Sequence, residues 1–225
     1  MLNEKILVIA AHSDDEVLGC GGTIAKLTAS GIKVSVMFMT NGVSARTIKN
    51  SSTASVAREN HARKAASILG IDEVLQYSFP DNSMDSVPLL DVTKCIEQEL
   101  SNLKPDTIFT HSLKDLNIDH QIVAQACITA TRPQQGMPVK EIYGFEVNSS
   151  TEWSFSGPSF NPKYFVNISS FFQTKINALK VYKDEVRSAP HPRSAESIET
   201  LAKYRGFQAG YGYAEAFEIF RIIES

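Results

Sequence analysis

The sequence predicts an α/β fold: a Rossmann-like, doubly wound and mostly parallel sheet with helices on both faces, in three layers. Short, continuously apolar segments such as Lys5–Ala10 and Val34–Met39 are typical of strands that are buried on both faces of a parallel sheet. Segments with helical periodicity alternate with these strands. Because consecutive parallel strands need a crossover connection, usually a helix, the alternation predicts a doubly wound sheet.

Each element is justified by its pattern and by the residues that end it. The helix predicted at Ala54–Leu69 has apolar residues on one face and ends at Gly70, and the amphipathic helix at Leu90–Leu103 ends before Pro105. In chain order we expect a strand at Lys5–Ala10, a helix at Thr23–Ser30, a strand at Val34–Met39, a polar loop at Ser44–Thr53, a helix at Ala54–Leu69, a strand at Val74–Tyr77, a loop at Pro80–Pro88, a helix at Leu90–Leu103, a strand at Thr107–Thr110, a helix at Ile118–Thr131 and a strand at Glu141–Val147.

The C-terminal third has a less regular pattern. The sequence predicts a strand at Phe165–Ile168, a helix at Lys175–Val186, a helix at Ser197–Tyr204 and a strand at Phe217–Ile223. No internal repeat, low-complexity run or linker interrupts the chain. Residues 1–225 are therefore predicted to form one domain. The irregular C-terminal third is expected to cover one end of the sheet, where a functional site would lie.

Composition and charge exclude several classes of function. The net charge of −3 gives the molecule no overall basic field for nucleic acid or an anionic membrane. No segment approaches the roughly 18 to 20 apolar residues of a membrane-spanning helix, and the N-terminal apolar run is too short for a signal peptide.

Cys20, Cys95 and Cys127 form no C-x-x-C pair, which argues against disulfides and cysteine zinc sites. We expect a cytoplasmic protein.

One imidazole and three carboxylates directly follow the first predicted strand, in Ala11-His12-Ser13-Asp14-Asp15-Glu16. So many like charges at a strand end are costly unless a cation lies among them, and a divalent metal is the simplest such cation. His12 and Asp15 can reach one ion from the same loop. Asp14 then stays beside the ion as an available general base. The motif therefore indicates metal-assisted hydrolysis.

A second polar stretch follows the fourth predicted strand, in Asp115-Leu116-Asn117-Ile118-Asp119-His120. In doubly wound sheets ligands bind beyond the carboxyl ends of the strands where the strand order reverses, and the first and fourth strands are neighbours there. The two loops should face each other, so we expect His12, Asp15 and His120 to bind the metal. Two histidines and one carboxylate leave a position open for water, which is typical of catalytic zinc.

Other interpretations of these residues stay open. Asn117 or Asp119 can simply cap the helix that follows, although Asp119 is also the expected acceptor for an imidazole N–H of a metal ligand. The glycines of Gly19-Cys20-Gly21-Gly22-Thr23 could cradle a phosphate at a helix N-terminus. They do not match the dinucleotide fingerprint and lie behind an acidic cluster. We interpret them instead as a tight helix start that packs closely against the sheet.

These motifs together resemble a known family. The stretches at residues 11–16 and 19–23, with Asn117-Ile118-Asp119-His120 downstream, are similar to motifs of the PIG-L/LmbE-like zinc deacetylases. Those enzymes remove acetyl groups from N-acetylglucosamine-type sugars. Pro190-His191-Pro192-Arg193-Ser194 and Tyr213-Ala214-Glu215-Ala216-Phe217 resemble the bacterial branch of the family. The resemblance covers most of the chain and implies Zn²⁺, or another divalent metal, as the cofactor.

The resemblance also implies roles for individual residues. His12, Asp15 and His120 match the family's zinc ligands, and Asp14 matches its general base. Arg58 lies where the family often has a substrate-contacting arginine, although a solvated charge on a helix is the plain alternative. The substrate contact of Arg58 is therefore an expectation that comes from the family alone.

The sequence departs from the family pattern at two positions. Ser13 stands where proline is usual, which should relax the loop but leaves the ligands in place. Asn117 stands where several members carry a histidine that stabilises the oxyanion, and an amide can donate a hydrogen bond but cannot supply a proton. We therefore predict Asn117 as a catalytic donor. The leaving amine would take its proton from Asp14, or from His111 or His191, which we also predict to bind the substrate.

The sequence thus predicts a zinc-dependent hydrolase that removes the N-acetyl group from an N-acetylglucosamine-type sugar or conjugate and releases acetate. The alternatives are a metal-dependent hydrolase of another amide or of a phosphoester, and a non-catalytic sugar- or nucleotide-binding module. Phosphoester hydrolysis would favour two metals about 3.5 to 4 Å apart, and the sequence supplies ligands for one. Because bacterial relatives commonly assemble with copies of themselves, a homo-oligomer is expected.

Overall fold

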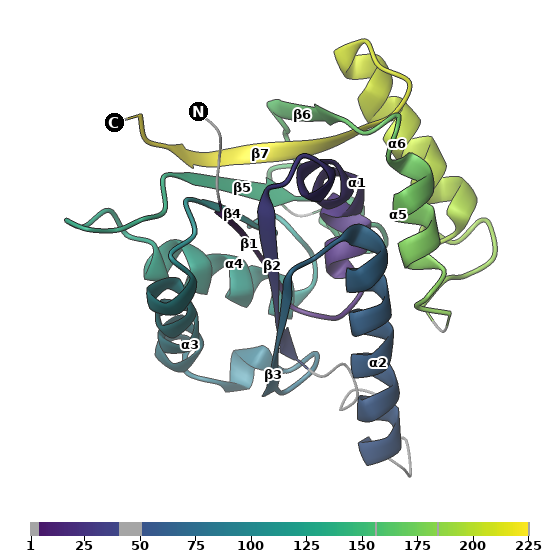
Figure 1. Ribbon diagram of the computed structural model, residues 1–225. Coiled ribbons are helices and arrows are strands. Elements are labelled where there is room, and N and C mark those ends of the chain that lie inside the picture. Colours follow the sequence, from purple (N-terminus) through teal and green to yellow (C-terminus); the bar gives the residue numbers. More distant parts are fainter. Residues whose placement is uncertain (1–4, 41–50, 156, 184, 225) are drawn as a thin grey trace.

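Seven strands form the central sheet, in the order β3-β2-β1-β4-β5-β7-β6 (Figure 1). The computed structural model describes residues 5–40, 51–155, 157–183 and 185–224. The strands are β1 (Lys5–Ala10), β2 (Lys33–Thr40), β3 (Glu73–Phe79), β4 (Thr107–His111), β5 (Glu141–Phe145), β6 (Tyr164–Asn167) and β7 (Ala214–Ile222). The helices are α1 (Asp15–Ala29), α2 (Ser51–Leu69), α3 (Leu89–Leu103), α4 (Ile118–Ala130), α5 (Phe172–Leu179) and α6 (Ala195–Ala209), with 3-10 turns at Met84–Ser86 and Thr151–Trp153.

Strands β1 to β5 are parallel, and the strand order reverses between β1 and β4. Helices α1, α2, α5 and α6 cover one face of the sheet, and α3 and α4 cover the other (Figure 1). Ile6, Val8 and Ala10 of β1 pack into the core of the first face, while Leu7 and Ile9 pack into the core of the second. Because both faces are buried, β1 is continuously apolar. The predicted doubly wound α/β fold is confirmed.

The first helix begins earlier than the sequence indicated. α1 starts at Asp15, directly within the acidic motif, whereas the predicted start was Thr23. A kink at Cys20, with φ −144° and ψ 20°, divides α1 into two helical segments. The prediction therefore found the second segment and missed the first, which carries Asp15 and Glu16 of the motif.

Two glycines in α1 allow close packing. A Cβ atom on Gly19 would lie 2.3 Å from the ring of Phe145, and one on Gly22 would lie 2.7 Å from Ile168. Any larger side chain would push the helix away from these neighbours. The predicted close approach of backbone is present, but the glycines lie inside α1 rather than at its start.

The C-terminal third is more regular than predicted. β7 runs antiparallel to both β5 and β6 and so extends the sheet by two strands. α6 spans Ala195–Ala209, longer than the predicted helix at Ser197–Tyr204. The predicted helix at Lys175–Val186 is wrong in its second half, because α5 ends at Leu179 and the chain turns inward to bury Tyr182. The residues after this turn reach the carboxyl ends of the parallel strands.

The remaining predicted elements agree with the structure to within a few residues at each end. The predicted loop at Ser44–Thr53 lies outside the described residues, except for its last three residues, which begin α2. Among the described residues, none of the helices combines the length and the apolar character that crossing a membrane requires.

Candidate active site

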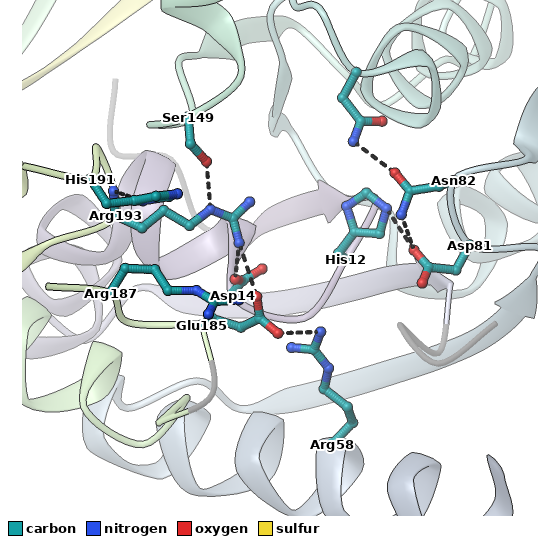
Figure 2. A pocket seen from close by; sticks show the side chains of 11 residues that line it. His12, Asp14, Arg58, Asp81, Asn82, Ser149, Glu185, Arg187, His191 and Arg193 are labelled. Carbon is teal, nitrogen blue, oxygen red and sulfur yellow. Dashed lines mark hydrogen bonds and ion pairs between the residues drawn. The ribbon is translucent and has the colours of Figure 1, made fainter. Parts of the chain in front are cut away.

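A cavity of about 270 Å³ lies at the carboxyl ends of the parallel strands, where the strand order reverses (Figure 2). Its wall is polar and carries charges of both signs. The lining residues are His12, Asp14, Arg58, Asp81, Asn82, Asn117, Ser149, Glu185, Arg187, His191 and Arg193. A wall so rich in hydrogen-bond donors and acceptors suits a polar ligand, such as a sugar, better than an apolar one.

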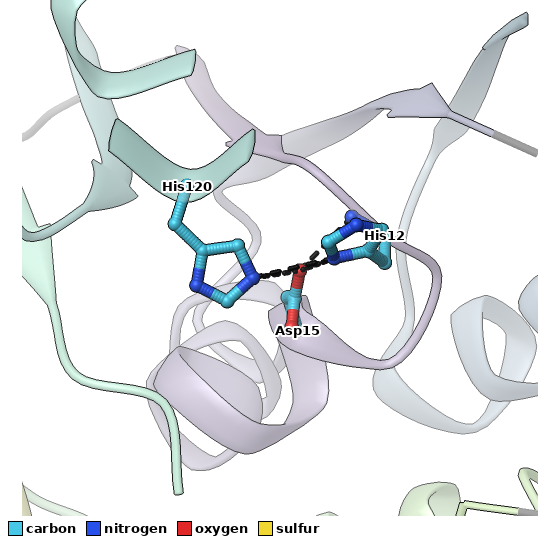
Figure 3. Close-up of side chains that lie close together, drawn as sticks. All are labelled: His12, Asp15 and His120. Carbon is cyan, nitrogen blue, oxygen red and sulfur yellow. Dashed lines mark hydrogen bonds and ion pairs between the residues drawn. The ribbon is translucent and has the colours of Figure 1, made fainter. Parts of the chain in front are cut away.

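The three predicted metal ligands meet beside this cavity (Figure 3). His12 and Asp15 follow β1, and His120 lies in the first turn of α4, which follows β4. His12 Nδ1 lies 3.1 Å from Asp15 Oδ2, and His120 Nε2 lies 3.3 Å from the same oxygen and 3.3 Å from His12 Nδ1. The segment that follows β1 and the start of α4, far apart in the sequence, thus bring three donor atoms to one point, as the switch-point argument predicted.

This donor set fits a divalent metal. His12, Asp15 and His120 each offer one ligand atom, and these atoms lie within 4.8 Å of one another. The other carboxylate oxygen, Asp15 Oδ1, is buried and has no hydrogen-bond partner within the described part of the chain. Such a buried oxygen is costly unless a cation or a donor satisfies it. Two imidazole nitrogens and one carboxylate oxygen are also the donors that catalytic zinc prefers.

The electrostatics of the cluster favour positive charge. Burial by itself would lower the pKa of His12, but hydrogen bonds to Asp119 and Asp15 raise it well above the usual value. Burial also opposes the charge of His120, yet the neighbouring Asp15 and Asp115 raise its pKa to about 9. Burial by itself would raise the pKa of Asp15, but the two neighbouring imidazoles hold it well below its usual range. The carboxylates therefore create a site that attracts a cation.

Carboxylates also lie close to the outer nitrogens of both histidines. Asp119 Oδ2 lies 3.0 Å from His12 Nε2, and Asp81 Oδ1 lies 3.2 Å from the same nitrogen. Asp115 Oδ1 lies 3.1 Å from His120 Nδ1. Carboxylates in these positions fix the orientation of a ligand ring and raise its basicity. Asp119 is the residue that the sequence predicts in this role.

Asp81 and Asp115, which lie beside His12 and His120, are not among the residues predicted from the sequence. A signal was available for each of them. Asp81 follows β3, whose carboxyl end lies at the same edge of the sheet as the end of β1. Asp115 lies in the same polar stretch as His120, and its carboxylate also accepts hydrogen bonds from Ser150 and Thr151. Position at the strand ends would therefore have identified both residues.

Asp14, the predicted base, lies on the cavity wall and is only 2 % exposed. Its Oδ2 lies 2.9 Å from Nη1 of Arg193. Burial raises the pKa of Asp14 and the charge of Arg193 lowers it, with a resulting value of about 6. The backbone of Asp14 has φ 125°, a conformation that residues other than glycine rarely adopt. A buried carboxylate in an unusual backbone conformation thus faces the cavity.

Arg193 belongs to a row of alternating charges along the cavity wall (Figure 2). Its Nε donates to Ser149 Oγ over 2.7 Å, and its Nη1 lies 3.4 Å from Glu185 Oε2. The other oxygen of Glu185 lies 2.8 Å from Nη2 of Arg58. Arg58 is therefore a member of the cavity wall rather than a solvated charge on the surface of α2. The row connects Arg58 on α2 with Asp14 at the start of α1.

His111 is placed where it does not contact a ligand in the cavity. It is fully buried at the end of β4, stacks on His120 with the ring centroids 3.9 Å apart, and accepts a hydrogen bond from Ala11 N at Nε2 over 2.8 Å. Burial lowers the pKa of His111 well below its usual value, so the ring is neutral. The prediction that His111 binds the substrate is corrected: its ring supports His120 from behind.

Asn117 and His191 do line the cavity. Asn117 Oδ1 accepts a hydrogen bond from Asp119 N over 2.8 Å and so caps α4, while its Nδ2 donates to Asn82 Oδ1 over 3.2 Å. The side chain of Asn117 therefore both caps α4 and lines the cavity. His191 Nδ1 accepts a hydrogen bond from Arg193 N over 3.0 Å, which orients its ring.

The sequence and the fold of this chain are similar to those of known proteins. The family model described as PIG-L: GlcNAc-PI de-N-acetylase matches residues 7–131. The uncharacterized deacetylase YaiS of Escherichia coli is 31% identical over 185 residues, which cover 79% of this chain and 90% of that protein. The diacetylchitobiose deacetylase of Thermococcus kodakarensis is 28% identical over 222 residues, which cover 94% of this chain and 81% of that protein.

The solved structures include the N,N'-diacetylchitobiose deacetylase of Pyrococcus horikoshii, which superposes with a TM-score of 0.80 at 22% identity. That superposition covers 97% of this chain and 84% of the other and shows a shared fold. The region matched by the family model spans more than half of the 225 residues and contains His12, Asp14, Asp15 and His120. The chain therefore belongs to the PIG-L family of de-N-acetylases, metal-dependent enzymes that hydrolyse amide bonds.

Proposed function

We propose that this chain removes the N-acetyl group from an N-acetylglucosamine-type sugar or sugar conjugate and releases acetate. The observation that carries the proposal is the position of Asp14 on the wall of a polar cavity, beside a cluster of His12, Asp15 and His120 that fits a divalent metal. A relative of 28% identity is named as a diacetylchitobiose deacetylase, which supports the choice of an N-acetylated sugar.

The proposed cofactor is Zn²⁺, held by Nδ1 of His12, a carboxylate oxygen of Asp15 and Nε2 of His120. When bound, such an ion polarises an amide carbonyl and lowers the pKa of a water molecule to about 7. Asp119 and Asp115 hold the two imidazole rings from behind, at 3.0 Å from His12 and 3.1 Å from His120. Their role is to keep both ligand nitrogens directed at the same point.

Asp14 is the proposed general base. Its carboxylate accepts a proton from the attacking water as the water oxygen bonds to the amide carbonyl carbon. When the carbon–nitrogen bond breaks, the amine needs a proton, and Asp14 can return the one that it accepted. Arg193, 2.9 Å away, keeps the carboxylate in place throughout.

Arg58, Asn117 and His191 are proposed to hold the sugar, because all three side chains line the cavity. Asn117 can donate from its amide to the oxygen that becomes negative in the transition state. To do so it must exchange its present hydrogen bond to Asn82 for one to the substrate. It cannot act as an acid, so we propose that Asp14 returns the proton, with His191 on the same cavity wall as the alternative donor.

The test is acetate release from a panel of N-acetyl sugars by the zinc-loaded protein. The panel contains free, glycosidic, lipid-linked and nucleotide-linked N-acetylglucosamine, and the Asp14→Asn variant at equal zinc content is the control. Release by the wild type but not by the variant supports the proposal. Equal turnover by the variant would contradict the role of Asp14. No release from any member of the panel would contradict the deacetylation of these sugars and indicate another amide as the substrate.

We also propose that the chain forms a homo-oligomer and acts in the cytoplasm. Cys20, Cys95 and Cys127 are all free thiols, which agrees with a reducing compartment. Light scattering coupled to size-exclusion chromatography would measure the assembly, and a mass equal to one chain would contradict it. Fractionation of the source cells would give the location.

A further inference from the structure

The backbone of Asp14 is held in a conformation that its own residue type does not favour. Its φ of 125° and ψ of −25° place it where the side chain of an L-residue meets its own backbone. Such a conformation persists only when the surrounding contacts determine it. The contacts that hold Asp14 therefore decide where its carboxylate points.

The side chain of Asp14 does not cap α1, although Asp14 occupies the N-cap position. Asp14 is the N-cap residue of α1, a position where an aspartate normally accepts a hydrogen bond from the helix that follows. Here its side chain makes no such bond and instead reaches Arg193 on the cavity wall. The carbonyl oxygen of Asp14 still accepts from Val17 N and Leu18 N, so the helix begins normally.

The N–H of Asp14 is held by Glu16. This N–H donates to Glu16 Oε2 over 3.0 Å, and Glu16 Oε1 accepts from the hydroxyl of Tyr182 over 2.7 Å. Both side chains are only 1 % exposed. Tyr182 lies in the turns that follow α5, 166 residues away from Glu16. Its ring also packs edge-on against His61 of α2, with the centroids 6.4 Å apart.

We propose that Glu16 and Tyr182 are positioning residues that hold the peptide of Asp14 so that its carboxylate faces the cavity. Tyr182 fixes the carboxylate of Glu16, and Glu16 fixes the backbone N–H of Asp14. Arg193 holds the side-chain carboxylate of Asp14. Without the Glu16 contact, Asp14 can relax to a negative φ, and its carboxylate then turns away from the cavity. The inference rests on the proposed function of Asp14 as the base.

Three variants separate positioning from simple stabilisation. Glu16→Met removes both hydrogen bonds at similar volume. Glu16→Gln keeps them, because the amide oxygen can accept from Asp14 N and the amide nitrogen can donate to the Tyr182 hydroxyl oxygen. Tyr182→Phe removes only the hydroxyl. The matched control is Tyr143→Phe, which removes a hydroxyl that donates to Glu141 over 2.8 Å on β5, away from the cavity.

We expect Glu16→Met to lower kcat by about 100-fold and Tyr182→Phe by about 10-fold, with KM and bound zinc unchanged, because small misplacements of a catalytic group have effects of this size. Glu16→Gln should recover most of the turnover, and Tyr143→Phe should retain it. A kcat of Tyr182→Phe within about twofold of the Tyr143→Phe control would overturn the proposal. So would a loss in Glu16→Gln equal to that in Glu16→Met.

A second readout does not depend on activity. Crystal structures of the wild type, Tyr182→Phe and Glu16→Met give φ of Asp14 directly. We expect φ near the present 125° in the wild type and a negative φ in Glu16→Met. If the wild type released no acetate but Asp14 relaxed in the variants, the proposed function would fail and the positioning role would stand. An unchanged φ in both variants would overturn the positioning role, whatever the activity.

Discussion

The guanidinium of Arg193 lies 2.9 Å from the carboxylate of Asp14, although the two residues are 179 positions apart in the sequence. This ion pair joins the segment before α6 to the start of α1, at the wall of the cavity. Arg193 is itself held by Ser149 and Glu185. The carboxylate proposed as the base is therefore oriented by a part of the chain that contributes none of the three proposed metal ligands.

Replacing Arg193 should impair turnover more than metal binding. In Arg193→Met the Asp14 carboxylate loses its partner, and we expect kcat/KM to fall by about 100-fold while zinc content stays at the wild-type level. Arg205→Met is the control, because Arg205 pairs with Glu146 over 2.7 Å outside the cavity lining. Steady-state kinetics with metal analysis make the comparison. Equal losses in the two variants would show that Arg193 acts only through stability.

Metal removal should lower the stability of the fold. A metal that binds only the native state at about 100 times its dissociation constant adds about 2.7 kcal/mol, which corresponds to a Tm increase of about 5 to 10 °C. We expect zinc to raise Tm by this amount after chelation, and Asp15→Asn to abolish the increase. Differential scanning calorimetry measures both. A zinc-dependent increase that persists in Asp15→Asn would place the metal elsewhere.

His111→Phe tests the corrected role of His111. The substitution leaves Ala11 N without its acceptor in a buried position, and an unsatisfied buried N–H costs about 1 to 3 kcal/mol. We expect urea unfolding to show a loss of that size, with KM unchanged because the ring lies outside the cavity lining. A raised KM at full metal content would instead return His111 to the substrate site.

Two substitutions can separate the helix-capping role of Asn117 from its proposed role as a hydrogen-bond donor to the oxyanion. Asn117→Ser keeps an oxygen at the N-cap of α4, so its stability should stay close to that of the wild type, whereas Asn117→Ala should lose about 1 kcal/mol. Both remove the amide that lines the cavity, and we expect kcat to fall in both, by up to about 100-fold for a lost oxyanion donor. Normal turnover in the stable serine variant would limit Asn117 to capping.

Gly22→Ala should be destabilising. Its Cβ would lie 2.7 Å from the side chain of Ile168, and overpacking of this kind costs about 1 to 3 kcal/mol. Gly157→Ala is the matched control, since a Cβ there meets nothing within 4 Å. Denaturant unfolding of the two variants gives the difference. Equal stability would show that α1 can move away from Ile168 at little cost.

The local parts of the site were predictable because they depend on short stretches of sequence. His12 and Asp15 lie three residues apart directly after β1. The apolar runs before them and before the second polar stretch placed both motifs at the carboxyl ends of strands. Helix ends were predictable where the backbone demands glycine, as at Gly31 with φ 81° and Gly70 with φ 74°. A parallel sheet then brought His120 to the other two ligands.

The long-range parts of the site were not predictable from pattern. The sequence pattern predicted a helix through Val186, whereas α5 ends at Leu179. The pattern therefore did not indicate that the chain after α5 brings a hydroxyl to Glu16 and a guanidinium to Asp14. His111 was misplaced for a simpler reason. The predicted strand stopped one residue before it, whereas β4 continues through His111 and buries its ring.

The proposed metal ligands and the residues that orient Asp14 lie in different parts of the sequence, so they are synthesised at different times. His12, Asp15 and His120 are synthesised well before Tyr182 and Arg193, since translation runs from the N-terminus. The contacts of Tyr182 with Glu16 and of Arg193 with Asp14 can both be present only after residue 193 has been made. The geometry of Asp14, near the N-terminus, therefore depends on a segment that leaves the ribosome late, and a chain that ends before Tyr182 lacks both contacts.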